Sequence, residues 1–168
     1  MFPKILDQIK EKCLQYGFFQ YLRLLKIRKN YKKQKNNIFN RFDEKSSFII
    51  HIPKTAGTSV TKSIYGTDVN YYHYDWNDLK VIMKKKFHNY FSFSIVRNPW
   101  DRCLSAYEFL KIGGYNADDK MFYEKYLACY NNFEDFIKNG LNKQKVLNGL
   151  HFIPQSNFIF SADDKCMV

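Results

Sequence analysis

Short hydrophobic runs alternate with longer amphipathic segments through the central part of the chain. Runs of this kind, bounded by polar or turn-forming residues, are typical of buried strands. We predict three strands, at residues 46–52 (SSFIIHI), 71–74 and 89–96 (NYFSFSIV). The segments 58–65 and 77–86 have the pattern of helices, and Asn77 is suited to cap the second. Strands that alternate with helices predict an α/β fold with a parallel sheet flanked by helices.

The second half of the chain is predicted to be mainly helical. Pro99 suits the first turn of a helix that extends to about Lys111, where Gly113 and Gly114 interrupt the pattern. Two further helices are predicted at residues 119–130 and 132–139, the second ended by Gly140.

The N-terminal segment differs from the rest in pattern and charge. Residues 2–28 place apolar side chains near helical spacing among lysines and arginines, which predicts one or two amphipathic helices, and residues 29–40 read as a flexible polar connector. We therefore divide the chain into a basic helical arm and linker, residues 1–45, and a domain, residues 46–168. Two interpretations of the arm stay open: a helix packed on the domain, or a peripheral membrane contact, because basic faces attract anionic lipids.

The charge distribution bears on the partners. The net charge is +11, but residues 1–41 carry 11 Lys and Arg against 2 Asp and Glu, and residues 42–168 carry 16 against 14. A nucleic-acid-binding domain normally carries its charge on the folded surface that meets the ligand, so we predict no nucleic acid partner. Because no apolar run approaches the ~20 residues that span a bilayer and no signal peptide is evident, the expected compartment is cytoplasmic, with membrane association as the alternative.

The segment from His51 to Val60 (HIPKTAGTSV) lies between a predicted strand and a predicted helix. Backbone N–H groups at a helix N-terminus favour an anion, small residues let the backbone close around it, and Lys54 adds a positive charge. The segment is not a Walker A loop, since Lys54 precedes its only glycine. An ordinary strand-to-helix turn is the alternative.

A second segment, from Ser94 to Tyr107 (SIVRNPWDRCLSAY), also joins a strand end to a helix. Arg97 is expected at the carboxyl edge of a parallel strand, where open α/β sheets bind ligands, and an arginine can grip a phosphate with two parallel donors. Ser105 follows about two turns into the helix. Alone, this segment is equally typical of an ordinary helix start.

Taken together, the two segments resemble the two nucleotide-binding motifs of the sulfotransferase family. HIPKTAGTSV is similar to the family's 5′-phosphosulfate loop, most of all in the branch of heparan sulfate 6-O-sulfotransferases and bacterial carbohydrate sulfotransferases. RNPWDRCLSAY is similar to the 3′-phosphate motif R-[DN]-P-x-x-R-x-x-S-x-[YW]. The resemblance implies a P-loop-like sheet and transfer of a sulfuryl group from 3′-phosphoadenosine 5′-phosphosulfate (PAPS) to a carbohydrate hydroxyl.

The resemblance also implies roles for individual residues. Lys54 is the residue expected to act at the bridging oxygen of the donor, Arg97 and Ser105 are expected at the 3′-phosphate, and Arg102 is expected to brace the motif. The residues expected around the 5′-phosphosulfate are Lys54, Thr55, Gly57, Thr58 and Ser59.

A general base is needed to activate the accepting hydroxyl, and histidine suits that role near neutral pH. H-Y-D-W-N-D-L, from His73 to Leu79, is similar to the pattern around the catalytic histidine of the 6-O-sulfotransferases, so His73 is the predicted base. His51 reads as a core residue, His88 as a surface residue and His151 as lining of the acceptor site. We expect no metal, because a sulfuryl group carries less charge than a phosphoryl group.

The resemblance covers about residues 46–160. Because family members usually continue beyond the part that resembles residues 156–168, we expect a C-terminally short domain. Two alternatives follow: a non-catalytic nucleotide-binding remnant of the fold, and a P-loop-type kinase, against which the position of Lys54 argues.

Overall fold

Two parallel strands form the sheet of the computed structural model. β1 (Ser47–Ile50) pairs with β2 (Phe91–Ser94) in a register that joins Ser47 to Phe91 and Ile50 to Ser94. The strands predicted at residues 46–52 and 89–96 are thus confirmed, each somewhat shorter. The structure describes residues 17–33, 37–66, 72–161, 163 and 165–168.

Three helices connect the strands: α4 (Gly57–Tyr65), α5 (Trp76–Met83) and α6 (Lys85–Asn89). The helix predicted at 58–65 is confirmed. The helix predicted at 77–86 is divided at Lys84, where the backbone adopts a φ of +56°. Its cap is Asp75 rather than Asn77, because the Asp75 carboxylate accepts a hydrogen bond from the Asp78 N–H at 2.8 Å.

The strand predicted at 71–74 is wrong for residues 72–74, which have no regular secondary structure; residue 71 lies outside the described residues. Tyr74 is buried against Phe39, whereas Tyr72 is exposed. In a strand, residues 72 and 74 would share one face, whereas here the Tyr74 N–H donates to the Tyr72 carbonyl at 2.9 Å, and neither described strand pairs with this segment. A β-type pattern forms a strand only where a partner is available.

A helical lobe with its own hydrophobic core follows β2. It contains α7 (Pro99–Lys111), α8 (Ala117–Tyr126), α9 (Phe133–Asn139) and α10 (Gln144–Leu147). The predicted helices are confirmed, with α8 beginning earlier because Asn116 caps it. Gly140 ends α9 as predicted, and a Cβ there would lie 2.6 Å from the Tyr130 ring.

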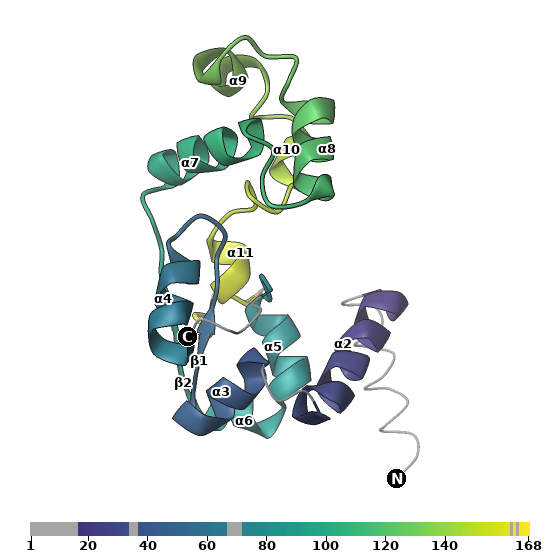
Figure 1. Ribbon diagram of the computed structural model, residues 1–168, viewed down its shortest axis with the longest axis vertical. Coiled ribbons are helices and arrows are strands. Elements are labelled where there is room, and N and C mark those ends of the chain that lie inside the picture. The colour runs from purple at the N-terminus through teal and green to yellow at the C-terminus, as the bar shows by residue number, and fades with distance from the viewer. Residues whose placement is uncertain (1–16, 34–36, 67–71, 162, 164) are drawn as a thin grey trace.

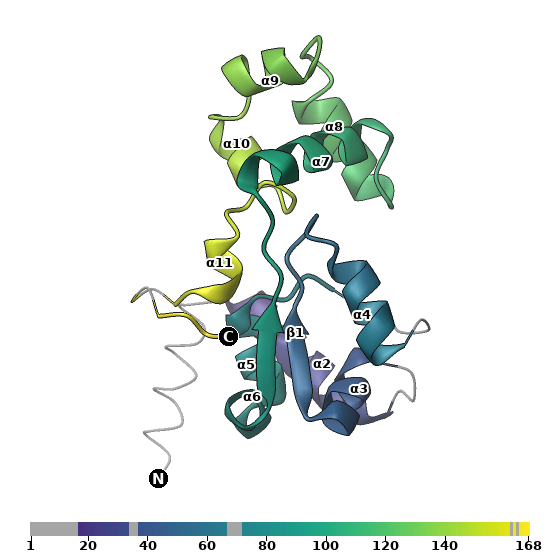
Figure 2. The same ribbon diagram turned by 90° about the vertical axis from the view of Figure 1, so that its left-hand side faces the viewer.

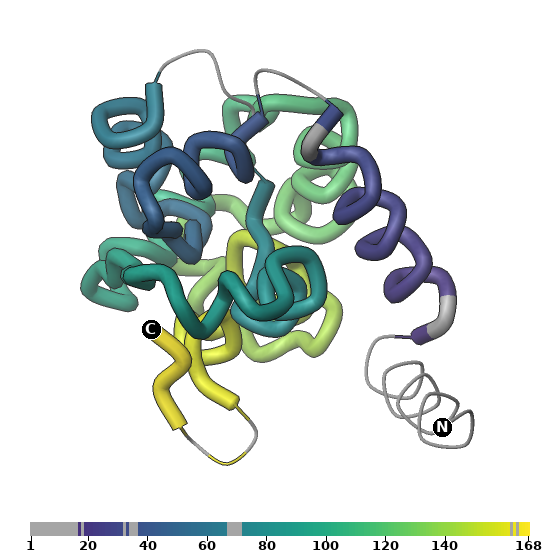
Figure 3. The backbone as a smooth tube through the Cα atoms, turned by 90° about the horizontal axis from the view of Figure 1, so that it is seen from below, coloured from purple at the N-terminus to yellow at the C-terminus, as the bar shows by residue number. Residues whose placement is uncertain are grey.

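The described part of the basic arm packs against the sheet lobe. α2 (Phe18–Asn30), the purple helix of Figure 3, packs on α5. Its Leu24 is fully buried in the core that also contains β1. The packed-helix interpretation is therefore confirmed for α2. The connector predicted at residues 29–40 is wrong where the structure describes it: α2 extends to Asn30, the short helix η1 (Tyr31–Lys33) follows, and Asn37 caps α3 (Ile38–Lys45). Residues 34–36 lie outside the described residues. Residues 1–16 lie outside the described residues, and the boundary at residue 45 stays a prediction.

The elements form layers around the two strands. Figure 1 shows α4 on one face of the sheet and α5 on the other, with α2 outside α5. Both strands point toward the helical lobe (Figure 2), and α11 (Ser156–Ile159) lies beside β2. The predicted α/β fold, a parallel sheet flanked by helices, is confirmed. Among the described helices, none is long and apolar enough to cross a membrane.

Candidate functional site

A cavity of about 290 Å³, which we call the loop cavity, lies where the strand ends meet the helical lobe. Six of the residues that line it were singled out from sequence as site residues, and a seventh as acceptor lining. These are Lys54, Gly57, Thr58, His73, Arg97, Ser105 and, for the acceptor, His151. The remaining described lining residues are His51, Pro53, Ala56, Phe109 and Tyr115.

The loop between β1 and α4 has a strained backbone. Lys54 and Ala56 both adopt left-handed conformations, with φ of +67° and +64°. Turns that combine left- and right-handed residues point successive N–H groups to one side and form concave anion sites. The loop ends at the N-terminus of α4, whose dipole also favours an anion.

Position 57 requires a glycine because a neighbouring side chain lies too close for a Cβ, and not because of its backbone angles. A Cβ at this position would lie 1.9 Å from Cδ2 of the buried His51 imidazole. Burial lowers the pKa of His51 to about 3, and the neighbouring His73 acts in the same direction. His51 is thus a neutral core histidine, as predicted, and it supports the loop from beneath.

Three hydroxyl residues of the loop have different positions. Thr55 is buried and its Oγ1 donates to the Ile52 carbonyl at 2.9 Å, so this hydroxyl stabilises the loop itself. Thr58 is exposed and lines the cavity, whereas Ser59 is exposed but outside the lining. Of the three hydroxyls, that of Thr58 is the one placed to meet a ligand in the cavity.

The two sequence motifs meet at this cavity. Arg97 follows β2, and its Nη1 donates to the Lys54 carbonyl at 3.4 Å. Gln155 fixes the backbone of Arg97 twice: its Oε1 accepts from the Arg97 N–H at 2.9 Å and its Nε2 donates to the Arg97 carbonyl at 2.8 Å. Lys54 and Arg97 therefore present their charges on the same side of the sheet.

Arg102, predicted to brace the 3′-phosphate motif, joins the loop to the helical lobe. It is buried on α7, its Nε donates to the Pro53 carbonyl at 2.8 Å, and its Nη1 donates to the Ile153 carbonyl at 3.0 Å. One side chain thereby positions both the loop and the segment that leads to Gln155.

The Lys54 side chain extends across the cavity to α7. Its Nζ lies 3.8 Å from the centre of the Phe109 ring, within the range of a cation–π interaction. Burial lowers the pKa of Lys54 and Arg97 lowers it further, while Asp119 opposes the shift. This ammonium group is held by an aromatic face rather than by a close carboxylate, a contact that an anion can replace.

His73 has a fixed tautomer. Its Nδ1 lies 2.9 Å from the His51 carbonyl, and because a carbonyl only accepts, Nδ1 carries the hydrogen and Nε2 the lone pair. Burial lowers the pKa of His73; the bond to the His51 carbonyl opposes this and the nearby His151 and Arg102 add to it. His73 is therefore neutral at pH 7 and can accept a proton.

A second histidine, His151, is oriented by a carboxylate. Its Nε2 lies 3.0 Å from Asp119 Oδ1, and the Phe109 ring contacts it edge-on at 5.1 Å. Burial lowers the pKa of His151 although Asp119 opposes the shift, so the contact is a hydrogen bond from a neutral imidazole rather than an ion pair. Asp119 Oδ2 also accepts from the Tyr115 N–H at 3.0 Å.

Sequence reasoning did not select Asp119, Phe109, Tyr115 or Gln155. Only Gln155 had a signal: it lies in the HFIPQSNFI segment that contains His151. The others become neighbours through the turn at Gly114, where the close approach of Asp119 leaves no room for a Cβ.

Chemically, the cavity combines two cations and a strained N–H loop with three neutral histidines, His51, His73 and His151. Such a set can bind two anionic groups and remove a proton from a hydroxyl. Within the described residues, no group of three His, Cys, Asp or Glu side chains is arranged to hold a metal ion.

A lysine-bearing loop and a strand-end arginine share one cavity at the edge of the parallel sheet, an arrangement suited to bind anions. The chain belongs to the sulfotransferase family, because the model of the "Sulfotransferase family" matches residues 22–167. The match begins inside α2, well before the two motifs. No curated protein and no solved structure matches the chain.

Proposed function

We propose that this protein transfers a sulfuryl group from PAPS to a hydroxyl group of a carbohydrate. The observation that carries the proposal is the common cavity of Lys54, Arg97 and His73, with Arg97 Nη1 only 3.4 Å from the Lys54 carbonyl. Two anion sites and a base at one cavity suit a donor with two anionic ends and an acceptor hydroxyl.

Each group of the donor has residues suited to it. Lys54, the loop N–H groups from Thr55 to Gly57, Thr58 and the start of α4 at Ser59 surround the 5′-phosphosulfate. Arg97 and Ser105 bind the 3′-phosphate, with Arg97 held in place by Gln155. The cavity contains no described carboxylate that would repel these groups.

In the proposed reaction, His73 Nε2 takes the proton of the acceptor hydroxyl as its oxygen attacks sulfur. The new O–S bond forms while the bond from sulfur to the 5′-phosphate oxygen breaks, and adenosine 3′,5′-bisphosphate leaves. Lys54 and the loop N–H groups stabilise the charge that develops on the leaving oxygen.

The donor half is tested by binding. Arg97→Ala should weaken adenosine 3′,5′-bisphosphate binding by roughly 10- to 100-fold, because hydrogen bonds to charged groups contribute about 1.5–3 kcal/mol. Lys145→Ala, which removes an exposed lysine of α10, is the matched control and should have no effect. Unchanged affinity in Arg97→Ala would rule out this 3′-phosphate site, and tighter binding of ATP would favour a kinase.

The transfer half is tested by incubating the protein with labelled PAPS and a panel of oligosaccharides, followed by mass spectrometry of the products. A mass increase of one sulfuryl group on a glycan, abolished in His73→Ala, is the expected result. Donor binding without transfer to any acceptor would favour a non-catalytic nucleotide-binding remnant.

A further inference from the structure

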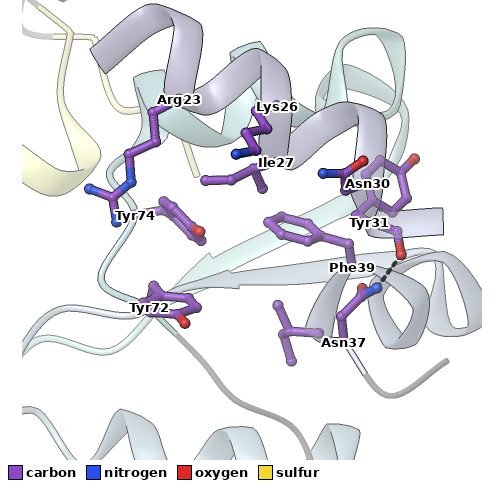
Figure 4. Close-up of a pocket in the computed structure, with 10 residues that line it drawn as sticks. Arg23, Lys26, Ile27, Asn30, Tyr31, Asn37, Phe39, Tyr72 and Tyr74 are labelled. Carbon is purple, nitrogen blue, oxygen red and sulfur yellow. Dashed lines mark hydrogen bonds between the residues drawn. The ribbon is translucent and has the colours of Figure 1, made fainter. Parts of the chain in front are cut away.

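A larger cavity of about 450 Å³, the arm cavity, lies beneath α2 and shares no lining residue with the loop cavity. Figure 4 shows its ten lining residues, most of them labelled, and none of these ten is acidic. They are Arg23, Lys26, Ile27, Asn30, Tyr31, Asn37, Ile38, Phe39, Tyr72 and Tyr74.

Two cations of this cavity are available to a ligand. Arg23 and Lys26 form no salt bridge with any residue in the described ranges, in contrast to Lys86, whose Nζ lies 2.5 Å from Asp43 Oδ2. The carboxyl group near Arg23 is that of Asp78, and burial raises its pKa to about 7. Cations without a salt bridge in the described residues favour an anionic ligand, and the acid that such a ligand meets beside Arg23 is Asp78.

Aromatic rings line the same cavity as these cations. The rings of Tyr72 and Tyr74 lie 5.8 Å apart, Tyr74 lies 5.9 Å from Phe39, and Tyr72 is 58% exposed. In Figure 4 the Arg23 guanidinium extends along the side of the cavity where both tyrosines lie. Apolar ring faces beside a few polar groups suit a ligand with alternating apolar and polar faces, such as a sugar.

A third cavity of about 470 Å³ adjoins the other two, and the carboxyl groups of Asp78 and Asp119 are part of its lining. It shares Tyr115, His73 and His151 with the loop cavity and Arg23, Tyr72 and Tyr74 with the arm cavity. A ligand whose hydroxyl lies at His73 can thus extend through this middle cavity to Arg23 and Lys26.

We propose that the arm cavity binds an anionic group of an extended oligosaccharide acceptor, remote from the hydroxyl that receives the sulfuryl group. This inference rests on the proposed function and assigns the arm a part in acceptor recognition. A membrane partner is the less suited one, since Leu24, Leu25 and Ile27 of α2 pack on the core, and the large apolar side chains of this helix that stay exposed are Phe19 and Leu22.

The test compares the full chain with its Arg23→Gln/Lys26→Gln variant. Lys29→Gln is the matched control, because Lys29 is an exposed cation of the same helix that does not line the cavity. Binding is measured calorimetrically, with adenosine 3′,5′-bisphosphate present, for several uronic-acid hexasaccharides and the carboxyl-reduced form of each. The KM values for transfer are measured with the same ligands.

We expect at least one acidic hexasaccharide to bind the wild type more tightly than its reduced form. The double variant should bind that acidic ligand with about tenfold lower affinity, as expected for lost charge-assisted hydrogen bonds. Its affinity for the reduced form and for the bisphosphate should change by less than twofold. Lys29→Gln should change none of them.

Four outcomes would overturn the inference: no preference for any acidic hexasaccharide, an equal loss for acidic and reduced ligands, an equal loss in Lys29→Gln, or unchanged binding in the double variant. The membrane alternative is supported if the double variant loses only co-sedimentation with phosphatidylserine vesicles. If charge-dependent binding follows the prediction but no acceptor is sulfated, the proposed function fails while the anion site stands.

Discussion

At the scale of single residues, His73 combines a fixed tautomer with a pKa below its usual range. The neutral form is the active base, so its fraction falls as the pH drops through the lowered pKa. We predict that kcat/KM stays level at pH 7 and declines only below pH 6.5, and that His73→Ala lowers kcat by roughly 10²- to 10⁴-fold. A pH–rate profile checks this, and an acid limb at or above pH 7 would contradict it.

Lys54 is predicted to act in the transition state more than in binding. Lys54→Met keeps the length of the side chain and its contact with Phe109 but removes the charge. We expect kcat to fall by about 10²- to 10³-fold, the range found when one oxyanion donor is lost. Lys62→Met, an exposed lysine of α4, is the control and should keep full activity.

His51 makes folding stability depend on pH. Its pKa is about 3 in the folded protein against 6.5 in the unfolded chain, so the unfolded state binds the proton first as the pH falls. Stability is unaffected by this group above pH 6.5 and decreases below it, by about 2 kcal/mol at pH 5. Urea unfolding at pH 7 and pH 5 should show this decrease in the wild type. In His51→Gln the drop in unfolding free energy between the two pH values should be smaller by about 2 kcal/mol. An equal decrease in both proteins would contradict the assignment.

At the scale of elements, Gly57 links the loop to the residue beneath it. Gly57→Ala places a methyl group within 1.9 Å of the His51 ring, so the loop or the ring must move. We expect a loss of about 1–3 kcal/mol in unfolding free energy, typical of overpacking, and weaker binding of adenosine 3′,5′-bisphosphate.

A double-mutant cycle separates this clash from other effects. His51→Ala removes the ring, so His51→Ala/Gly57→Ala should be less destabilised than the sum of the single variants, by at least about 0.5 kcal/mol. Strict additivity in urea unfolding would mean that the two positions do not interact.

Helices that begin with a local signal were the most predictable elements. Pro99 begins α7 and Asn132 caps α9, both readable from a few neighbouring residues. The strand predicted at residues 71–74 failed over residues 72–74, because pairing depends on a distant partner that the local pattern does not reveal. The division of the helix at Lys84 also had no local signal, since lysine rarely adopts a positive φ.

At the scale of the whole molecule, the sequence predicted seven of the residues that line the loop cavity but not what holds them in place. Lys54, Arg97 and His73 come from motifs and were brought together as expected. The contacts of Asp119 with His151 and of Gln155 with Arg97 join segments 32 and 58 residues apart. Such contacts depend on how the two lobes pack, which hydrophobic periodicity does not encode.

The packing of the lobes is itself open to test at Arg102. This buried side chain on α7 donates to carbonyl groups of the phosphate loop and of the segment before α11, and so connects the core of the helical lobe to that of the sheet. Arg102→Met preserves much of the apolar volume but leaves the carbonyls of Pro53 and Ile153 without this donor.

We predict that Arg102→Met lowers the unfolding free energy by about 2–4 kcal/mol, because hydrogen bonds to a charged donor are lost from a buried site. Lys138→Met, which breaks the exposed pair with Glu134, should cost under about 1 kcal/mol. Hydrogen exchange should rise at the loop amides from Lys54 to Gly57 in Arg102→Met alone, and donor affinity should fall with it. If stability falls while loop exchange and donor affinity stay unchanged, Arg102 supports the fold without organising the site.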